Sequence, residues 1–204
     1  LNGNRLLIDN NANVNIQDDN GASALMCADN DLIIARLLIE RGANVNAQNS
    51  LGNTALIFSA DAGYLPITRI LIESGANINI QMIDGQTPLM CACSNGHLDV
   101  ASLLIRFKAD INATDNSKNK ALSHAVGSGN IEIVRLLIQA GADVNSQDNF
   151  GDTVLINACV QGNLEIASLL IHSGANTNAT DEVGNVALID ASWGGHLNIV
   201  ELLI

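Results

Sequence analysis

The sequence repeats itself at a regular interval of about 33 residues. The tripeptide Leu-Leu-Ile, or its variant Ile-Leu-Ile, begins at Leu6, Leu37, Ile70, Leu103, Leu136, Leu169 and Leu202. The first interval is slightly shorter than the others, and all the later intervals are equal. A period of this kind indicates one supersecondary unit copied in series, in which each copy packs mainly on its neighbours. The repeat therefore predicts a stack of similar units rather than one thick core.

Each unit reads as two short helices separated by turns. In one copy, the polar segment 147–151 contains Asn, Asp and Gly, the residues that favour turns. Thr153 then precedes an apolar run and is placed to accept free N–H groups of a first helical turn, and Gly162 ends that run. Apolar residues within 164–171 recur at helical spacing, and Gly174 is placed to end the second helix in a left-handed conformation. The pattern predicts a turn, a helix, a second turn and a second helix in each copy.

Several segments carry a family pattern. Thr-Pro-Leu stands at 87–89, Gly-His-Leu at 96–98 and Gly-Ala-Asp-Val-Asn at 141–145. Together with the regular repeat, these segments resemble the ankyrin repeat, and the resemblance covers essentially the whole chain. It implies an all-α fold, an ankyrin-repeat α-solenoid of stacked antiparallel helix pairs joined by β-hairpin-like loops. It also implies an interaction surface and no chemistry, because a fold does not by itself define an activity.

We predict a single ankyrin-repeat domain over residues 1–204. Its repeats are a partial one at 1–17, five at 18–48, 49–81, 82–114, 115–147 and 148–180, and a truncated one at 181–204. Natural ends of such arrays usually carry polar capping repeats, and neither end of this sequence has that character. We therefore expect the segment to belong to a longer array.

The repeat at 115–147 matches the family pattern least well. It has Lys118 where Gly is expected and Lys120 where Thr is expected, and Lys108 stands where Gly should end the preceding helix. A Lys with positive φ is strained. We therefore predict that this repeat is the softest internal part of the array.

Two other departures predict local changes. In the repeat at 18–48, which is shorter than the next four, Asp29-Asn30-Asp31 must replace the Gly between the two helices. The family usually has His after Thr-Pro-Leu, and here that position holds Met26, Ile57, Met90, Ser123, Ile156 and Ile189. Apolar burial is therefore expected to replace a polar contact between the first helix and the hairpin.

The four cysteines are Cys27, Cys91, Cys93 and Cys159. None has metal-ligand spacing with a His, so we interpret all four as small buried apolar side chains. Unpaired cysteines favour a reducing compartment, which predicts a cytoplasmic location.

The net charge of −12 is unevenly distributed. Residues 136–204 hold eight acidic residues and no Lys or Arg. A nucleic-acid-binding surface needs a positive charge, so nucleic acid is excluded as a partner. The acidic end has two explanations: solubility of a large surface, or attraction of a basic protein partner.

No apolar run reaches the roughly 18–20 residues of a membrane span, so membrane insertion is not expected.

No arrangement of residues predicts catalysis. A nucleophile, a base and an orienting group do not appear in any recognisable motif. His97 and His196 occupy the same repeat position, where the family resemblance gives His a structural role. The polar turns lack the twelve-residue loop of a calcium site. We expect no enzyme, no cofactor and no metal.

The candidate site residues follow from the family resemblance. In ankyrin arrays the groove-facing positions are the hairpin tip, the residue after the tip Gly, and the end of the first helix. Carried over to this sequence, these positions give Leu51, Ile83, Phe150, Asp152, Val160, Val183 and Trp193. Exposed aromatic side chains are typical anchors of interfaces. We therefore expect Trp193 to form an apolar surface with Phe150, Val160 and Val183, with acidic Asp152 at its edge. Alternatively, Trp193 covers an array end that a parent chain would bury.

The main functional prediction is a protein-binding module that presents a concave face of hairpin tips and first helices to a protein partner. The chain would be a monomer or part of a longer chain. The alternative is a structural spacer or regulatory arm of a larger enzyme or channel, without a partner of its own.

Overall fold

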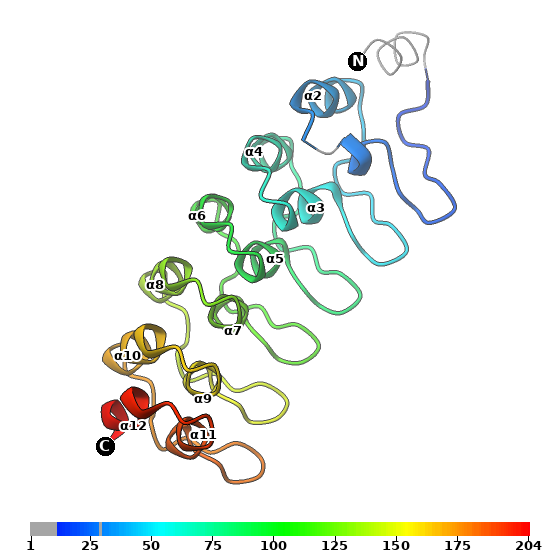
Figure 1. The fold of residues 1–204 in the computed structure, drawn as a ribbon. Coiled ribbons are helices and arrows are strands. Elements are labelled where there is room, and N and C mark those ends of the chain that lie inside the picture. Colours follow the sequence, from blue (N-terminus) through cyan, green and yellow to red (C-terminus); the bar gives the residue numbers. More distant parts are fainter. Residues whose placement is uncertain (1–11, 29) are drawn as a thin grey trace. The chain divides into compact units, whose positions relative to one another are not determined.

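The computed structural model of the protein describes residues 12–28 and 30–204 (Figure 1). These residues form eleven α-helices and one short 3₁₀-helix, η1. In chain order they are η1 (Met26–Ala28), α2 (Leu32–Glu40), α3 (Ala55–Asp61), α4 (Leu65–Glu73), α5 (Pro88–Ser94), α6 (Leu98–Arg106), α7 (Ala121–Gly127), α8 (Ile131–Gln139), α9 (Val154–Val160), α10 (Leu164–His172), α11 (Ala187–Trp193) and α12 (Leu197–Leu203). β-Pairing in the described part is limited to isolated bridges, between Gln17 and Ser23 and between Gln147 and Thr153. The predicted all-α repeat fold is confirmed, while residues 1–11 of the partial repeat predicted at 1–17 lie outside the described residues.

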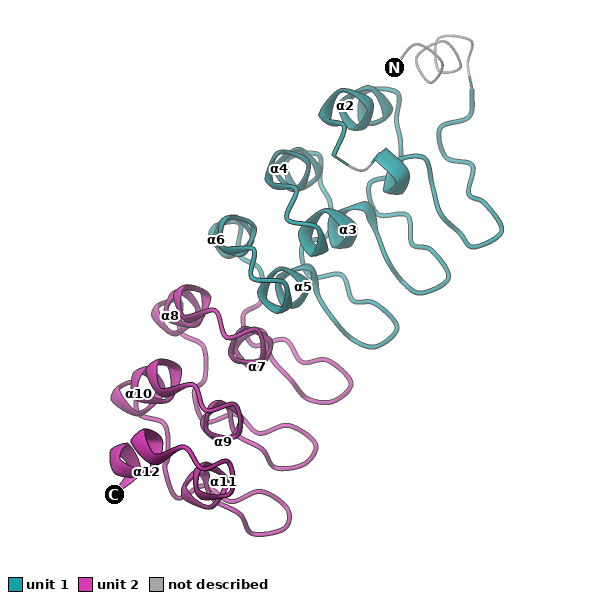
Figure 2. Cartoon of the chain, viewed as in Figure 1, with its two compact units in different colours: residues 1–109 teal, residues 110–204 magenta. Residues whose placement is uncertain are grey.

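The chain divides into two compact units, residues 1–109 and 110–204 (Figure 2). In the first unit, η1, α3 and α5 pack in series as one layer, and α2, α4 and α6 form a second layer. In the second unit, α7, α9 and α11 form the first layer and α8, α10 and α12 the second. The loops that join successive pairs extend beyond the first-layer helices as hairpins (Figure 1). The organisation of 1–204 as a single domain stays a prediction.

Side-chain caps explain where many helices begin. Thr54, Thr87 and Thr153 accept hydrogen bonds from the backbone N–H groups three residues later, at N···O distances of 3.3, 3.3 and 3.2 Å. On the second helices, Asn130 and Asn163 accept from Ile133 and Ile166, both at 3.1 Å. Each cap satisfies a helix N–H group that has no partner within the helix. The predicted role of Thr at the start of the first helix is confirmed at these three positions.

Small residues let the first-layer helices approach closely. Ala92, Ala125, Ala158 and Ala191 occupy the same position in successive repeats and have no exposed surface. The corresponding residue in the preceding repeat is Ser59, which is also buried. Its hydroxyl donates to the carbonyl of Leu56 at 3.0 Å and accepts from the Thr68 hydroxyl at 3.0 Å. A polar pair therefore fits this core position because its hydrogen bonds are satisfied.

Two lysines have the left-handed backbone that the sequence predicts. Lys108 has φ = 69° and Lys118 has φ = 62°. Gly151, which corresponds to Lys118 one repeat later, has φ = 80°. A Cβ at Gly151 would lie 2.8 Å from the backbone nitrogen of Glu182 in the next hairpin. Glycine is needed there for the close approach of two backbones as well as for the dihedral angle.

The repeat at 18–48 differs from the others because its first helix is reduced to the three-residue η1. Asp31 caps the following helix, accepting from the N–H groups of Ile33 and Ile34 at 3.0 Å each. Beside η1, a cavity of about 370 Å³ is lined by residues that include Cys27, Phe58 and Tyr64. A shortened helix leaves this space open. Of the turn predicted at 29–31, Asp31 takes part by capping α2, and Asp29 lies outside the described residues.

The prediction that all four cysteines are buried is wrong for Cys27, which is exposed. Cys27 lies on the shortened η1 and lines the cavity there. Cys91, Cys93 and Cys159 are buried as predicted. Apolar burial at the position after the helix start also fails at Ile189, which is 37% exposed, whereas Ile156 is 2% exposed.

Candidate protein-interaction face

The hairpin tips are shaped by acidic or amide side chains that accept backbone hydrogen bonds. Asp148 Oδ1 accepts from the N–H groups of Phe150 at 2.8 Å and Asp152 at 3.0 Å. Asp181 Oδ1 accepts from Val183 at 2.9 Å and Asn185 at 2.7 Å in the same way. Such turns hold the intervening side chain at the outer edge of the loop. This geometry explains why Phe150 and Val183 are 68% and 81% exposed.

Backbone hydrogen bonds join neighbouring tips. In the first unit, the N–H of Ile83 donates to the carbonyl of Leu51 at 3.1 Å. In the second unit, the N–H of Glu182 donates to the carbonyl of Phe150 at 2.9 Å. The structure therefore brings Leu51 close to Ile83, and Phe150 close to the tip that carries Val183. Leu51 and Ile83 belong to one unit, whereas the other five predicted site residues belong to the second unit.

Asparagine side chains bridge consecutive repeats at the base of the hairpins. Asn46 Oδ1 accepts from the N–H of Asn77 at 2.7 Å, and its Nδ2 donates to the carbonyl of Gly75 at 3.2 Å. In the second unit, Asn145 makes the equivalent bonds to Asn176 and Gly174, at 2.8 and 3.1 Å. An amide satisfies one donor and one acceptor of the next repeat, which holds successive loops in a common register.

His97 and His196 have the structural role predicted for them. His97 Nε2 lies 2.9 Å from the carbonyl oxygen of Asp61, and His196 Nε2 lies 3.3 Å from that of Val160. Each imidazole thus reaches the last turn of the first helix in the preceding repeat. A Cβ at Gly63 would lie 2.5 Å from the His97 ring. Gly63, in the turn between α3 and α4, therefore leaves room for the His97 ring of the next repeat.

The ends of α9 and α11 carry the remaining apolar site residues. Val160 is 55% exposed and Trp193 is 76% exposed. The two helices pack side by side, and the bond from His196 to Val160 connects the turn after Trp193 with the end of α9. We define Phe150, Asp152, Val160, Val183 and Trp193 as the tip face of the second unit.

Asp190 also belongs near this face, although the sequence reasoning missed it. It lies on α11 three residues before Trp193, and residues three apart share a side of a helix. Its Oδ2 is shielded from solvent and has no hydrogen-bond partner in the described structure. No periodic signal in the sequence marks Asp190, because the same position holds Phe58 four repeats earlier.

The acidic side chains of the second unit differ in protonation behaviour. Burial, followed by the charges of Asp148, Asp181 and Asp190, raises the pKa of Asp152 above its usual value. Burial and the charge of Asp181 likewise raise the pKa of Asp190. For Asp181 itself, desolvation is outweighed by hydrogen bonds from Asn185, Val183 and Gly184, and its pKa is lowered. Asp152 and Asp190 are therefore the carboxylates of this group whose burial is not offset by hydrogen bonds to the ionised form.

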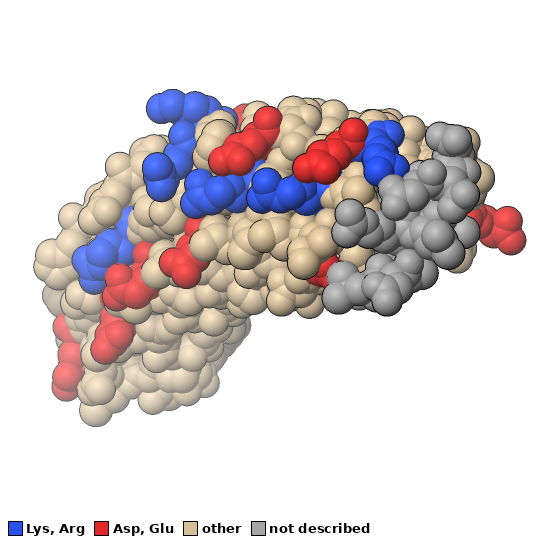
Figure 3. Space-filling view, turned by 90° about the horizontal axis from the view of Figure 1, so that it is seen from above, with Lys and Arg blue, Asp and Glu red and all other residues tan. Residues whose placement is uncertain are grey.

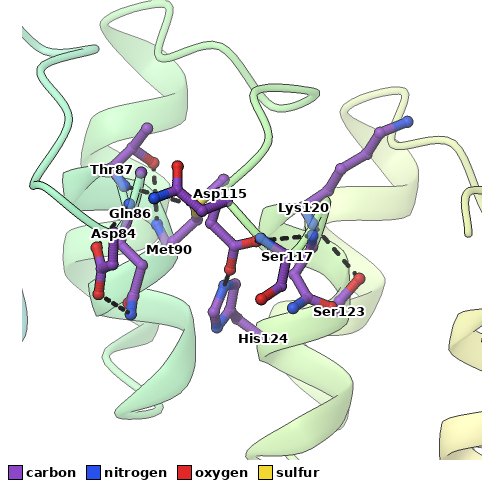
Figure 4. A network of polar contacts seen from close by, with 12 residues as sticks. Asp84, Gln86, Thr87, Met90, Asp115, Ser117, Lys120, Ser123 and His124 are labelled. Carbon is purple, nitrogen blue, oxygen red and sulfur yellow. Dashed lines mark hydrogen bonds and ion pairs between the residues drawn. The ribbon is translucent and has the colours of Figure 1, made fainter. Parts of the chain in front are cut away.

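A partly buried contact between an Asp and a His distinguishes the repeat at 115–147 (Figure 4). Asp115 Oδ1 accepts from the N–H groups of Ser117 and Asn119, both at 2.9 Å. Its Oδ2 lies 3.1 Å from His124 Nε2 on α7. The side chains of His124 and Asp115 are only 16% and 8% exposed. The Asp115 carboxylate thus shapes the tip and connects it to α7. Asp115 and His124 therefore both have a structural role.

The corresponding turn in the first unit is built differently. Met82 stands at the position of Asp115, and Asp84 at the tip accepts from the backbone and side-chain nitrogens of Gln86, both at 3.0 Å (Figure 4). The hairpin therefore tolerates a change of side-chain partner without losing its turn.

Charges on the face shown in Figure 3 are of both signs, with Lys and Arg next to Asp and Glu. Four arginines lie on second helices: Arg36 on α2, Arg69 on α4, Arg106 on α6 and Arg135 on α8. On the second unit, an open depression between α8, α10 and α12 places Arg135 among Glu132, Glu165 and Glu201. The basic side chain of that depression is thus surrounded by acids on the second-helix layer.

The buried cysteines are unreactive as thiols. Burial, with added repulsion from Asp61 and Asp84, raises the pKa of Cys91 to about 12. Burial and the neighbouring Cys91 raise the pKa of Cys93 to about 12, and burial and Asp190 raise that of Cys159 to about 11. A thiol rather than a thiolate at neutral pH is a poor nucleophile.

The described residues contain neither a metal-binding cluster nor a membrane-spanning helix. No group of three or more His, Cys, Asp or Glu side chains within residues 12–28 and 30–204 could hold a metal ion. None of the helices in this described part is long and apolar enough to cross a membrane.

The helix pairs, the hairpins and the bridging side chains define a helical repeat protein. Comparison with family models matches ankyrin repeats in three copies, over residues 2–82, 80–148 and 140–204. The chain therefore belongs to the ankyrin repeat family, whose members are generally protein-interaction modules and typically non-enzymatic. A search of curated proteins finds no match.

Proposed function

We propose that this protein is a non-enzymatic module that binds a protein partner through the tip face of the second unit. The observation that carries the proposal is the exposure of Trp193, Phe150 and Val183, which are 76%, 68% and 81% exposed on neighbouring tips and helix ends. Large apolar side chains exposed together are a marker of interaction sites. Trp is also the residue type most enriched among residues that dominate binding energy.

Leu51 and Ile83 form a second, smaller apolar contact region on the first unit. They are 60% and 68% exposed and lie on hydrogen-bonded tips. We assign them a supporting role in partner binding, because neither is accompanied by an exposed aromatic residue on the same tips.

The test is an affinity capture from a lysate of the source organism, read by mass spectrometry. Wild-type protein is compared with a Phe150→Ala/Trp193→Ala variant. A matched control, Ile33→Ala/Leu197→Ala, removes side chains that are 67% and 65% exposed on the second helices α2 and α12. We expect a protein retained by the wild type and the control to be lost by the tip-face variant.

Once that partner is purified, each single substitution at Trp193 or Phe150 should weaken binding by about 2 kcal/mol, or roughly 30-fold in Kd. Identical protein lists for all three baits would contradict the proposed face. That result would favour the spacer or regulatory-arm function.

A further inference from the structure

The tip face of the second unit includes one partly buried carboxylate, Asp152, and a second partly buried carboxylate, Asp190, lies near it on α11. Asp152 follows the tip that carries Phe150, and Asp190 lies one helical turn before Trp193. Asp190 Oδ2 is shielded from solvent without a hydrogen-bond partner in the described structure. A buried acceptor left unsatisfied costs free energy, and the cost is larger for a charged group.

The two carboxylates interact with each other and with further acids. The charge of Asp190 acts on Asp152, as do those of Asp148 and Asp181. Asp148 and Asp181 already accept two backbone hydrogen bonds each at their tips. The uncompensated negative charge is therefore concentrated at Asp152 and Asp190.

Two of the three Lys and Arg side chains of the second unit are engaged elsewhere, and the third, Lys118, is exposed on the tip before the one that carries Phe150. The sequence has no Lys or Arg after Arg135, and Arg135 lies among acids in the depression on the second-helix layer. Lys120 pairs with Asp143 at 3.2 Å. The described residues form no ion pair with Asp152 or Asp190, so a partner can supply the cation there.

We propose that this carboxylate pair receives a lysine or arginine side chain of the protein partner, while apolar side chains of the same partner segment contact Phe150, Val183 and Trp193. This inference rests on the proposed function and specifies its partner as a basic, apolar-flanked segment. Complementary charge in a partly desolvated position favours such a pair more than it would in bulk water. Trp193 adds an aromatic face for a cation or an apolar group.

A protein segment fits this surface better than a metal ion does. The described residues offer no cluster of three or more His, Cys, Asp or Glu ligands, whereas divalent cations in oxygen sites take six or more ligands. The exposed apolar side chains beside the carboxylates also need apolar contacts, which an ion alone does not provide.

The test uses a phage-displayed library of random dodecapeptides, selected against the whole chain. Selections run in parallel on the wild type, on Asp152→Asn/Asp190→Asn, on Phe150→Ala/Trp193→Ala, and on Glu165→Gln/Glu201→Gln. The last variant removes the same two negative charges from exposed positions on the second helices α10 and α12, so it controls for net charge.

We expect wild-type selections to enrich peptides that contain Lys or Arg next to aromatic or aliphatic residues. A synthetic copy of the most enriched peptide should bind Asp152→Asn/Asp190→Asn at least tenfold more weakly than the wild type. It should bind Glu165→Gln/Glu201→Gln within twofold of the wild type. Its affinity for the wild type should fall with added salt more steeply than its affinity for Asp152→Asn/Asp190→Asn, because one charge contact has been removed.

The outcomes separate this inference from the proposed function. Enriched peptides without basic residues, or equal affinity for the wild type and Asp152→Asn/Asp190→Asn, overturn the charge inference. In that case the proposed function stands if Phe150→Ala/Trp193→Ala still weakens binding. If no selected peptide depends on any of the four substituted residues of this face, both the inference and the proposed binding face fail.

Discussion

Two neighbouring repeats of the second unit have the same helices but different side chains at key positions. The repeat at 115–147 has first and second helices Ala121–Gly127 and Ile131–Gln139, and the repeat at 148–180 has Val154–Val160 and Leu164–His172. Corresponding helices have the same length in both repeats.

The hairpin and the helix start show the difference. At the tip, Lys118 and Gly151 both have positive φ. At the start of the first helix, Thr153 caps α9, whereas Lys120 makes no side-chain cap on α7. Lys120 instead donates its backbone N–H to Ser123 Oγ at 3.4 Å.

Packing against the neighbouring helices maintains the repeat geometry even where the local residues disfavour it. Ala125, Ile133 and Leu137 of the irregular repeat are as completely buried as Ala158, Ile166 and Leu170 of the regular one. Burial of a large apolar side chain contributes about 1.5–3 kcal/mol, whereas an unusual φ or a missing cap costs about 1–3 and about 1 kcal/mol. The irregular repeat therefore keeps its fold and should be locally less stable.

The largest effect is expected from making the regular tip resemble the irregular one. Gly151→Ala should lower the free energy of unfolding by about 2 kcal/mol, since it adds positive-φ strain and a backbone clash. The clash is specific, because the new Cβ would meet the backbone of Asp181 and Glu182 at 2.8–3.0 Å. Gly174→Ala is the control, with φ = 92° but nothing within 4 Å of its Cβ. Urea denaturation should show the smaller loss for the control; equal losses would contradict the proposed clash.

The opposite exchange should strengthen the irregular tip. Lys118→Gly should raise the free energy of unfolding by about 1 kcal/mol, because relief of strain exceeds the added entropy of the unfolded chain. Native-state hydrogen exchange of the α7 amides should slow by up to about fivefold. Lys118→Ala keeps the strain and should show no gain. If α7 in the wild type already exchanges as slowly as α9, the predicted softness of this repeat is wrong.

A restored cap should have a smaller effect. Lys120→Thr should add about 0.5 kcal/mol, because the cap is worth about 1 kcal/mol and an exposed ion pair with Asp143 is lost. Lys120→Val provides the control, since Val186 begins α11 without a side-chain cap. Thermal unfolding measures the difference, and an equal gain for Val would exclude capping as its cause.

An effect of similar size is expected at the acidic face. Asn119 stands at the position that Asp152 occupies in the next repeat. Asp152→Asn therefore places the uncharged residue of the irregular repeat in the regular one. Burial and neighbouring acids raise the pKa of Asp152, which means that its ionised form is disfavoured in the folded protein. The penalty is present above the folded pKa and disappears below the unfolded pKa of about 3.9.

At pH 7, Asp152→Asn should therefore stabilise the protein by about 0.5 kcal/mol, the size of exposed charge interactions. The gain should vanish in urea titrations as the pH falls to about 3, below the unfolded pKa. Glu165→Gln is the matched control with an exposed acid on α10. A gain that persists at low pH would show that the effect does not come from charge.

The candidate site residues could be chosen from the sequence because the repeat gives each residue its register, and their role in binding stays a prediction. The exposure of Phe150, Val183 and Trp193 follows from their tip and helix-end positions. Asp190 was missed because its importance depends on shielding of one oxygen and on the charges around it. These features arise from side chains of the neighbouring repeat and have no periodic signature.

The sequence alone was sufficient to predict the family, the turns at Gly positions, the helix starts at Thr positions, and the positive φ of Lys108 and Lys118. These features depend on residues close together in the sequence, and the same residues recur in several repeats. The reduction of the first helix at 18–48 to η1 and the exposure of Cys27 depend on tertiary packing. The hydrogen bond from the Thr68 hydroxyl to the Ser59 hydroxyl in the core depends on it as well. Such outcomes depend on how side chains from different helices fill or share one space, and a repeat pattern does not encode that packing.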